Sequence, residues 1–287
     1  MAPKTWEILS ETKRIIDAQP RHYLTLSLIF LLPPSFVSLL FNFLVKYLQQ
    51  QPPPPPPTYH TILIFSIVSI LLLLIFSIFT LCAFISITYS VYHSYFNQPV
   101  KLKEAIKSIS TSFFPLLATD IIFFTIFFIV FLLFALLVGA VSFLLTYLAG
   151  VDLQFHSFLV NVSLMLVLLT FMLYLGVHLS LVKVIVVVES IWGLEPLRRS
   201  WKLVKGMKRL ILSTLSLIGS LQSMLAWLTG YSWALILVIS PIVAMLSLYS
   251  IAVLTVLYIY CKEKNEKLED ENFGKEKDEA SLLLITS

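Results

Sequence analysis

Three ionisable residues, Asp120, His178 and Lys183, interrupt otherwise apolar stretches of the chain. A charged side chain inside a membrane is costly, so such residues mark a proton relay, an ion path or a structural pair. Asp120 lies about seven residues into one apolar stretch, and Lys183 and His178 lie about five and ten residues before the end of the next. Because consecutive spans run antiparallel, Asp120 is expected to pair with Lys183 or His178. A relay and a structural or interfacial role both remain open.

A second group of ionisable side chains is basic and closely spaced. At 100° per residue, Arg198, Lys202, Lys205 and Arg209 fall within a helical sector of about 60°, with Arg199 beside them. Such a face suits anionic lipid headgroups, because each basic residue near an anionic surface contributes about 1 kcal/mol. The same residues are also expected if they only enforce the orientation of the chain in the membrane.

Residue patterns for catalysis or metal binding are absent from the sequence. It has no glycine-rich phosphate loop, no His-x-x-x-His pair and no nucleophile elbow. Its two cysteines, Cys82 and Cys261, lie in different apolar stretches and predict no disulfide framework. We therefore predict a protein that is not an enzyme, with no catalytic, cofactor-binding or metal-binding residues.

The composition determines the class of element that must position these residues. Of the 287 residues, 58% are hydrophobic and only 13% are charged, and the mean hydropathy is +0.91. Soluble domains carry about 25% charged residues, so a soluble protein is excluded. The sequence predicts an all-α polytopic membrane protein with six spans, because backbone groups in lipid must bond within a helix. The expected spans are residues 23–48, 61–92, 113–148, 155–188, 210–228 and 232–260.

The basic residues predict the orientation of these spans. All of them except Lys46 and Lys183 fall in the N-terminal segment, the second and fourth connections, or the C-terminal tail. Lysine and arginine are retained in cytoplasmic loops. Because six spans return the chain to its starting side, both termini are predicted to be cytosolic.

Each outward-going span is preceded by an amphipathic stretch that we expect to lie as a helix in the plane of the lipid headgroups. These three cytosolic interfacial helices suggest a threefold parallel repeat of one surface helix and two spans. The charged residues after Cys261 predict a disordered cytosolic tail. The predicted organisation is a six-span domain at 1–261, with repeat units at about 5–92, 101–188 and 194–261, and a tail at 262–287.

Two sequence segments carry a resemblance to a known family. Residues 188–206 read VESIWGLEPLRRSWKLVKG, and residues 99–105 read PVKLKEA. They resemble the signatures of bacterial YciC-like proteins and of the glycerophosphodiester phosphodiesterase membrane domain. The whole chain also resembles an uncharacterised family of plant multi-pass membrane proteins. The resemblance implies a membrane module only, because the phosphodiesterase of those bacterial proteins is a separate soluble domain, and it carries over no catalytic residue.

Two functions are compatible with these features. The first is a non-enzymatic endomembrane protein that organises lipids or partner proteins, without nucleic acid, through its basic cytosolic surface. The alternative is a transporter or channel for a small, weakly polar solute, with a path along Asp120, His178 and Lys183. Residues 278–283 resemble an acidic dileucine sorting signal, which would imply post-Golgi traffic. We expect an endomembrane, the endoplasmic reticulum or a post-Golgi membrane, in preference to the plasma membrane. A cavity reaching mid-membrane would favour transport, and a packed bundle with a cytosolic groove would favour interaction.

Overall fold

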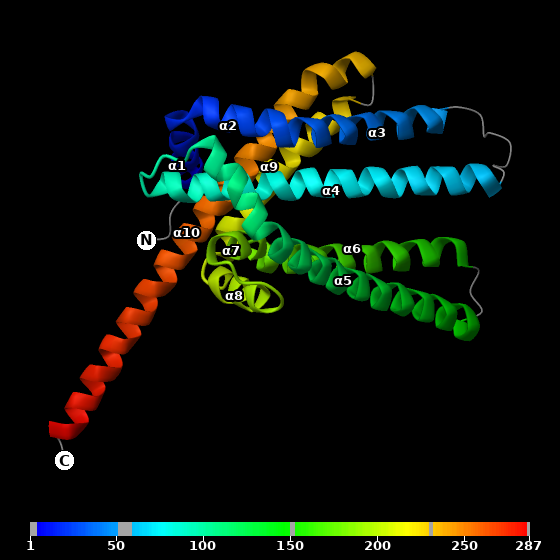
Figure 1. Ribbon diagram of the computed structural model, residues 1–287. Helices are drawn as coiled ribbons and strands as arrows, with labels where there is room; N and C mark the ends of the chain where they lie inside the picture. The colour runs from blue at the N-terminus through cyan, green and yellow to red at the C-terminus, as the bar shows by residue number, and fades with distance from the viewer. Residues whose placement is uncertain (1–4, 51–58, 150–152, 230–231, 286–287) are drawn as a thin grey trace.

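The computed structural model describes residues 5–50, 59–149, 153–229 and 232–285. This part of the chain forms helices and no β-strand (Figure 1). The elements are α1 (Thr5–Ala18), α2 (Pro20–Leu26), the π-helical turn η1 (Ser27–Leu31), α3 (Leu32–Gln50), α4 (Tyr59–Tyr95), α5 (Leu102–Ala149), α6 (Leu153–Leu179), α7 (Val182–Glu189), α8 (Glu195–Val204), α9 (Lys208–Leu228) and α10 (Trp233–Ile285).

Six helical segments of the described chain are long and apolar enough to cross a membrane. This number confirms the predicted all-α polytopic fold, and the protein is an integral membrane protein. Helices satisfy every backbone hydrogen bond internally, which hydrocarbon requires of a spanning segment. The segments are Pro20–Lys46, Ser66–Tyr95, Leu102–Val141, Met165–Glu189, Lys208–Leu228 and Trp233–Lys267.

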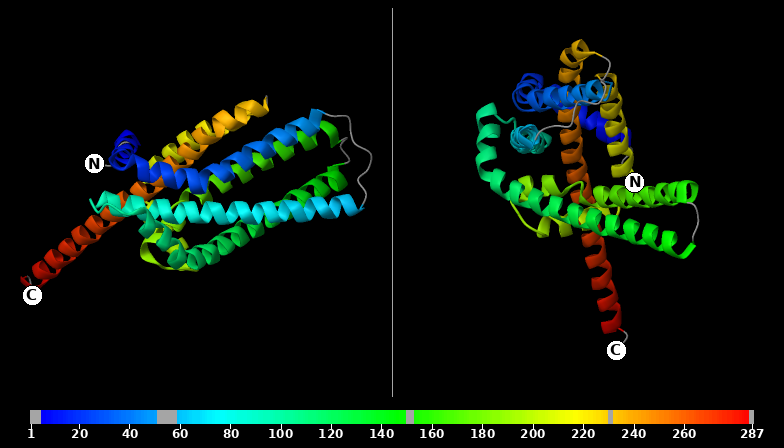
Figure 2. Two further views of the ribbon diagram at one scale, coloured as in Figure 1. Left: turned by 45° about the horizontal axis from the view of Figure 1, so that its top comes forward. Right: turned by 90° about the vertical axis from the view of Figure 1, so that its right-hand side faces the viewer.

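The spans are arranged as three helical hairpins, α3 with α4, α5 with α6, and α9 with α10. They diverge from one end of the molecule, where α1, α8 and the long C-terminal part of α10 also lie (Figure 1). The two further views show the same divergence (Figure 2). We call this end the basic end, because the helix α8 and the connection between α4 and α5 bring their lysines and arginines there. The sequence predicts that the basic end is cytosolic.

The hydrophobic core lies near the basic end. Ile8 of α1, Tyr23 of α2, Ile85 of α4, Ile185 of α7 and Leu257 of α10 are all fully buried. Toward the opposite end, large apolar side chains of α4, α5 and α6 are exposed. In a bilayer this exposure is not costly, because lipid tails are as apolar as the side chains they contact. Tight packing is therefore concentrated where the three hairpins converge.

A proline pair explains the one π-helical turn among the described elements. Pro33 and Pro34 have no N–H, so they cannot donate to the carbonyls four residues earlier. The chain forms η1 just before them, and the Leu32 N–H donates to the Ser27 carbonyl, five residues back. Such single π-turns are a known way for a helix to accommodate an interrupted hydrogen-bond ladder.

The structure differs from two predictions about the amphipathic segments. The second segment is not a separate surface helix, because residues 102–110 form the first turns of the continuous helix α5. The apolar faces of the other two pack against protein: Ile8 and Ile15 of α1 and Val204 of α8 are buried in the core. Converging hairpins leave apolar surface at the basic end, and α1 and α8 cover it.

The C-terminal segment also differs from the predicted disorder. From Lys262 the helix α10 continues to Ile285. Lysine and glutamate have high helix propensity, and Glu263 stands four residues before Lys267, the spacing and order that favour a helix. Local helix propensity therefore extends the last span beyond the bundle (Figure 1). Beyond Lys267, only the backbone of α10 is described, and the dileucine sequence at residues 278–283 lies there.

Candidate functional site

A tight chain reversal places the basic helix α8 beside the end of α7. Ser190 ends α7 in a left-handed conformation with φ 55°, and Gly193 has φ 89°. This conformation suits glycine, which lacks the Cβ that strains other residues there. The Gly193 N–H donates to Thr119 Oγ1 of α5 at 3.4 Å, and Pro196 then stands in the first turn of α8. The reversal is thus held against the second hairpin.

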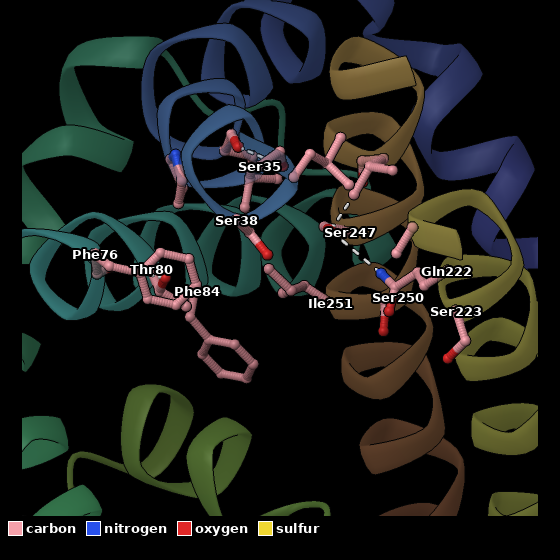
Figure 3. A pocket seen from close by; sticks show the side chains of 15 residues that line it. Ser35, Ser38, Phe76, Thr80, Phe84, Gln222, Ser223, Ser247, Ser250 and Ile251 are labelled. Atoms are coloured by element: carbon pink, nitrogen blue, oxygen red, sulfur yellow. Dashed lines mark hydrogen bonds between the residues drawn. The ribbon is translucent and has the colours of Figure 1, made fainter. Parts of the chain in front are cut away.

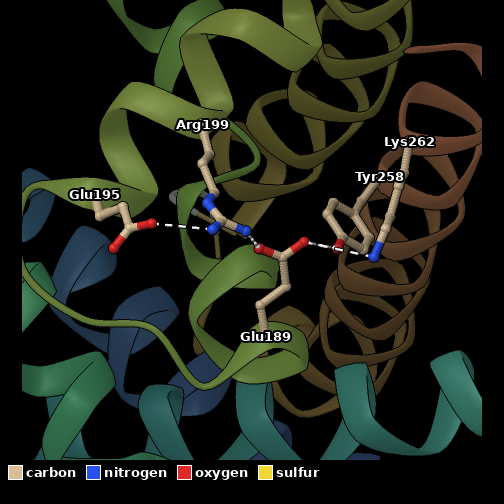
Figure 4. A network of polar contacts seen from close by, with 5 residues as sticks. All are labelled: Glu189, Glu195, Arg199, Tyr258 and Lys262. Atoms are coloured by element: carbon tan, nitrogen blue, oxygen red, sulfur yellow. Dashed lines mark hydrogen bonds and ion pairs between the residues drawn. The ribbon is translucent and has the colours of Figure 1, made fainter. Parts of the chain in front are cut away.

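Glu189 is the centre of a polar network that joins α7, α8 and α10 (Figure 4). Its carboxylate accepts hydrogen bonds from Arg199 Nη1 of α8 at 2.6 Å and from the hydroxyl of Tyr258 of α10 at 2.7 Å. Lys262 Nζ of α10 lies 3.6 Å away. Arg199 also bonds Glu195 at 3.0 Å. The Glu189 side chain is only 15% exposed, so its charge needs partners within the protein. The side chains of Arg199, Tyr258 and Lys262 supply them.

The network determines the role of Arg199. Its hydrogen bonds to Glu189, and next those to Glu195, raise the pKa of Arg199 above its ordinary value. The guanidinium therefore stays charged, and both of its terminal nitrogens are engaged within the protein. Of the five basic residues predicted to face lipid, Arg199 is the one that anchors α8, because its exposed guanidinium is paired with Glu189 and Glu195.

The other four basic residues remain exposed. Arg198 and Lys202 lie on α8, Lys205 follows its last residue, and Arg209 lies in the first turn of α9. The predicted continuous basic helix is therefore wrong, because a turn at residues 205–207 separates α8 from α9. None of the four forms an ion pair with another described residue. We call these four residues the α8 surface.

The extension of α10 caps the end of α8. Lys264 Nζ donates to the Gly206 carbonyl at 3.2 Å, and Asn265 Nδ2 donates to the Leu203 carbonyl at 3.4 Å. The last carbonyls of a helix have no partner within it, and cations near them are favourable. Cys261, which is fully buried, contacts Met207 at 3.6 Å between sulfur atoms. The helix α8 is therefore held by α7 at one end and α10 at the other.

The structure brings two of the three predicted intramembrane residues together. Lys183 Nζ of α7 lies 2.9 Å from Asp120 Oδ2 of α5, one of the two pairings expected from their depth. His178 of α6 lies apart from this pair. Its ring stacks on Trp201 of α8 at 3.9 Å between centroids, and its backbone carbonyl accepts a 2.7 Å hydrogen bond from Ser200. His178 thus helps to hold α8 against α6.

A cavity of about 440 Å³, which was not predicted from the sequence, lies between α3, α4, α9 and α10. Its lining is apolar with neutral polar groups at several points (Figure 3). A usable signal exists in the sequence, because Ser35 and Ser38, like Ser247 and Ser250, are spaced three apart within apolar helices. Such pairs share one face of a helix. Neither Asp120 nor Lys183 lines this cavity.

Comparisons with protein-family models, with curated proteins and with solved structures find no match for this chain. The resemblance to YciC-like proteins stays a prediction.

Proposed function

We propose that this protein is a non-enzymatic, multi-pass endomembrane protein that organises anionic lipids or partner proteins through the α8 surface. The observation that carries the proposal is that one cation of this segment is paired within the protein and its neighbours are not. Arg199 is engaged by Glu189 and Glu195, whereas Arg198, Lys202 and Lys205 are exposed and without an ion pair to described residues. Cations that are not engaged within the protein remain available to an external anion.

The anchoring of α8 supports this proposal. Arg199, Trp201 and the Leu203 carbonyl of α8, and Gly206 just after it, are all held by other helices, so the backbone that carries the exposed cations is held in place. A pre-organised site loses less conformational entropy on binding than a flexible one. Trp192 and Leu194, both 67% exposed, lie in the connection before α8. Exposed aromatic and apolar side chains beside cations are typical of segments that contact the membrane interface.

The alternative, a transporter or channel for a small, weakly polar solute, ranks second. Its predicted path runs along Asp120, Lys183 and His178, but the first two neutralise each other directly and the third is covered by Trp201. The observation in its favour is the cavity between α3, α4, α9 and α10. Solute uptake into proteoliposomes that is lost on filling this cavity would move transport to first place.

Binding of anionic lipid by the purified full chain tests the first proposal. Native mass spectrometry in detergent would compare added phosphatidylserine, phosphatidylinositol 4-phosphate and phosphatidylcholine. We expect tighter binding of the two anionic lipids. Replacing Arg198, Lys202 and Lys205 together by glutamine should weaken that binding about 100-fold, because each basic residue contributes about 1 kcal/mol and 1.4 kcal/mol corresponds to tenfold.

A matched control uses three other exposed lysines of the basic end. Glutamine at Lys101, Lys103 and Lys107 removes the same charge from the start of α5, and we expect less than about a threefold loss. Thermal unfolding of both triple variants, compared with wild type, separates a loss of lipid binding from a change in folding or topology. Equal binding of phosphatidylcholine and the anionic lipids would contradict lipid recognition and leave partner proteins as the ligand of the α8 surface.

A further inference from the structure

The cavity between α3, α4, α9 and α10 has a chemically uniform polar lining. Among the described residues, those that line it carry no charged side chain. In Figure 3, Gln222 reaches from α9 toward Ser247 on α10, and the hydroxyl of Ser38 points into the space beside α3. Its polar groups include Ser35, Ser38, Thr80, Gln222, Ser247 and Ser250. A volume of about 440 Å³ falls within the range of small-ligand sites, about 300–1,000 Å³.

The hydroxyl hydrogens of this lining are largely used within the protein. Ser35 donates to the Leu31 carbonyl at 2.7 Å, Thr80 donates to the Phe76 carbonyl at 2.8 Å, and Ser247 donates to the Val243 carbonyl at 2.8 Å. A serine or threonine has one hydroxyl hydrogen and two lone pairs. These oxygens can therefore only accept further hydrogen bonds.

Gln222 extends this pattern. Its Nε2 donates to Ser247 Oγ at 3.2 Å, which leaves its carbonyl oxygen as an acceptor. A ligand that satisfies the oxygens of Ser35, Thr80, Ser247 and Gln222 must supply a donor. A hydroxyl group does so, and its oxygen can also accept from the serines at positions 38 and 250 of the lining. The ligand must also be neutral, because an ion without a countercharge is costly inside a membrane.

The cavity is continuous in its lining with a groove open to the bilayer. Ser38 and Phe76 line both the cavity and a second space of about 280 Å³ between α3 and α4. Phe41 and Leu73 of this second space are each 64% exposed. An apolar body can therefore lie in the groove while a donor group at its end reaches the polar lining.

We propose that this cavity binds an uncharged lipid alcohol, with its hydroxyl donating to Ser35, Thr80, Ser247 or Gln222 and its hydrocarbon in the groove between α3 and α4. The inference is independent of anionic lipid binding at the α8 surface, because the two sites share no residue. It assigns to the protein a site for a neutral lipid within the membrane.

Photolabelling of the reconstituted full chain tests the proposal. The probe is a diazirine-bearing long-chain alcohol, compared with its methyl ether and with the corresponding fatty acid. We expect saturable labelling of peptides from α3, α4 or α10 by the alcohol. Competition should be about three- to tenfold weaker for the ether, which cannot donate, because a net hydrogen bond corresponds to about that factor. Equal competition by alcohol and ether, or stronger labelling by the acid, would overturn the proposal.

Two variants locate the site. Ser38→Phe should abolish saturable labelling by filling the junction of cavity and groove, and wild-type labelling of this variant would refute the location. Ser247→Ala removes one acceptor and frees the Gln222 amide to donate, so the preference for alcohol over ether should fall toward one. Ser220→Ala is the matched control. Like Ser247, Ser220 donates its hydroxyl hydrogen within its own helix, which is α9, but it does not line the cavity. Thermal unfolding of each variant reports folding independently.

Discussion

Replacing Glu189 by alanine tests the anchor of α8 directly. The change leaves the hydroxyl of Tyr258 without its acceptor, and Tyr258 is fully buried. A hydrogen bond to a charged group contributes about 1.5–3 kcal/mol, and a buried unpaired donor adds a desolvation cost. The Lys262 side chain is 40% exposed and its Nζ lies 3.6 Å from the Glu189 carboxylate, so losing this contact adds little. We expect the free energy of unfolding to fall by about 2–3 kcal/mol, or about 4–12 °C in Tm.

The buried thiol of Cys261 supplies the assay. It lies one turn beyond Tyr258 and contacts Met207, so a thiol-reactive fluorophore reacts with it only when α10 separates from the turn after α8. Heating the purified chain in a Cys82→Ser background then reports Tm from one thiol. The Glu189→Ala variant should also react faster at 25 °C, because the anchor of α8 opens more often.

Glu195→Ala is the matched control for this experiment. It removes only the exposed contact of Arg199, four residues along the same helix, and such surface pairs contribute little. We expect its Tm to stay within about 2 °C of wild type. If the Glu189→Ala protein had the same Tm as this control and its Cys261 thiol reacted at the same rate, Glu189 would not anchor α8.

The remaining predictions concern one ion pair and two glycines. Asp120→Asn should lower the stability by about 1–3 kcal/mol, because it leaves Lys183 without its partner, and adding Lys183→Met should restore much of it. Thermal unfolding would refute a structural pair if the double variant were no more stable than the single one. Gly193→Ala should destabilise by about 1–2 kcal/mol through its positive φ, whereas Gly219→Ala in α9 meets no atom within 4 Å and should stabilise by about 0.5–1 kcal/mol. Changes of the same sign at both glycines would contradict this argument.

The basic segments show where sequence periodicity succeeds and where it stops. Arg198 and Lys202 both lie on α8 and are exposed, and their role as a lipid surface stays a prediction. The position of Arg209 on the same helix is wrong, because residues 205–207 form a turn that ideal periodicity does not foresee. The engagement of Arg199 also escaped the sequence, since its main partner Glu189 lies ten residues away across a chain reversal.

The number and class of the spans follow from the sequence, because hydrocarbon admits a crossing segment only if its length is apolar and its backbone is internally bonded. The similar depth of Asp120 and Lys183 in the membrane follows in the same way, by counting residues from the ends of adjacent spans. The rotation and tilt of the helices do not follow, because helices that are apolar on every side carry no periodic signal of which face packs inward. Only the tertiary structure therefore brought Tyr258 to Glu189 and turned Ser35, Thr80 and Ser247 toward one cavity.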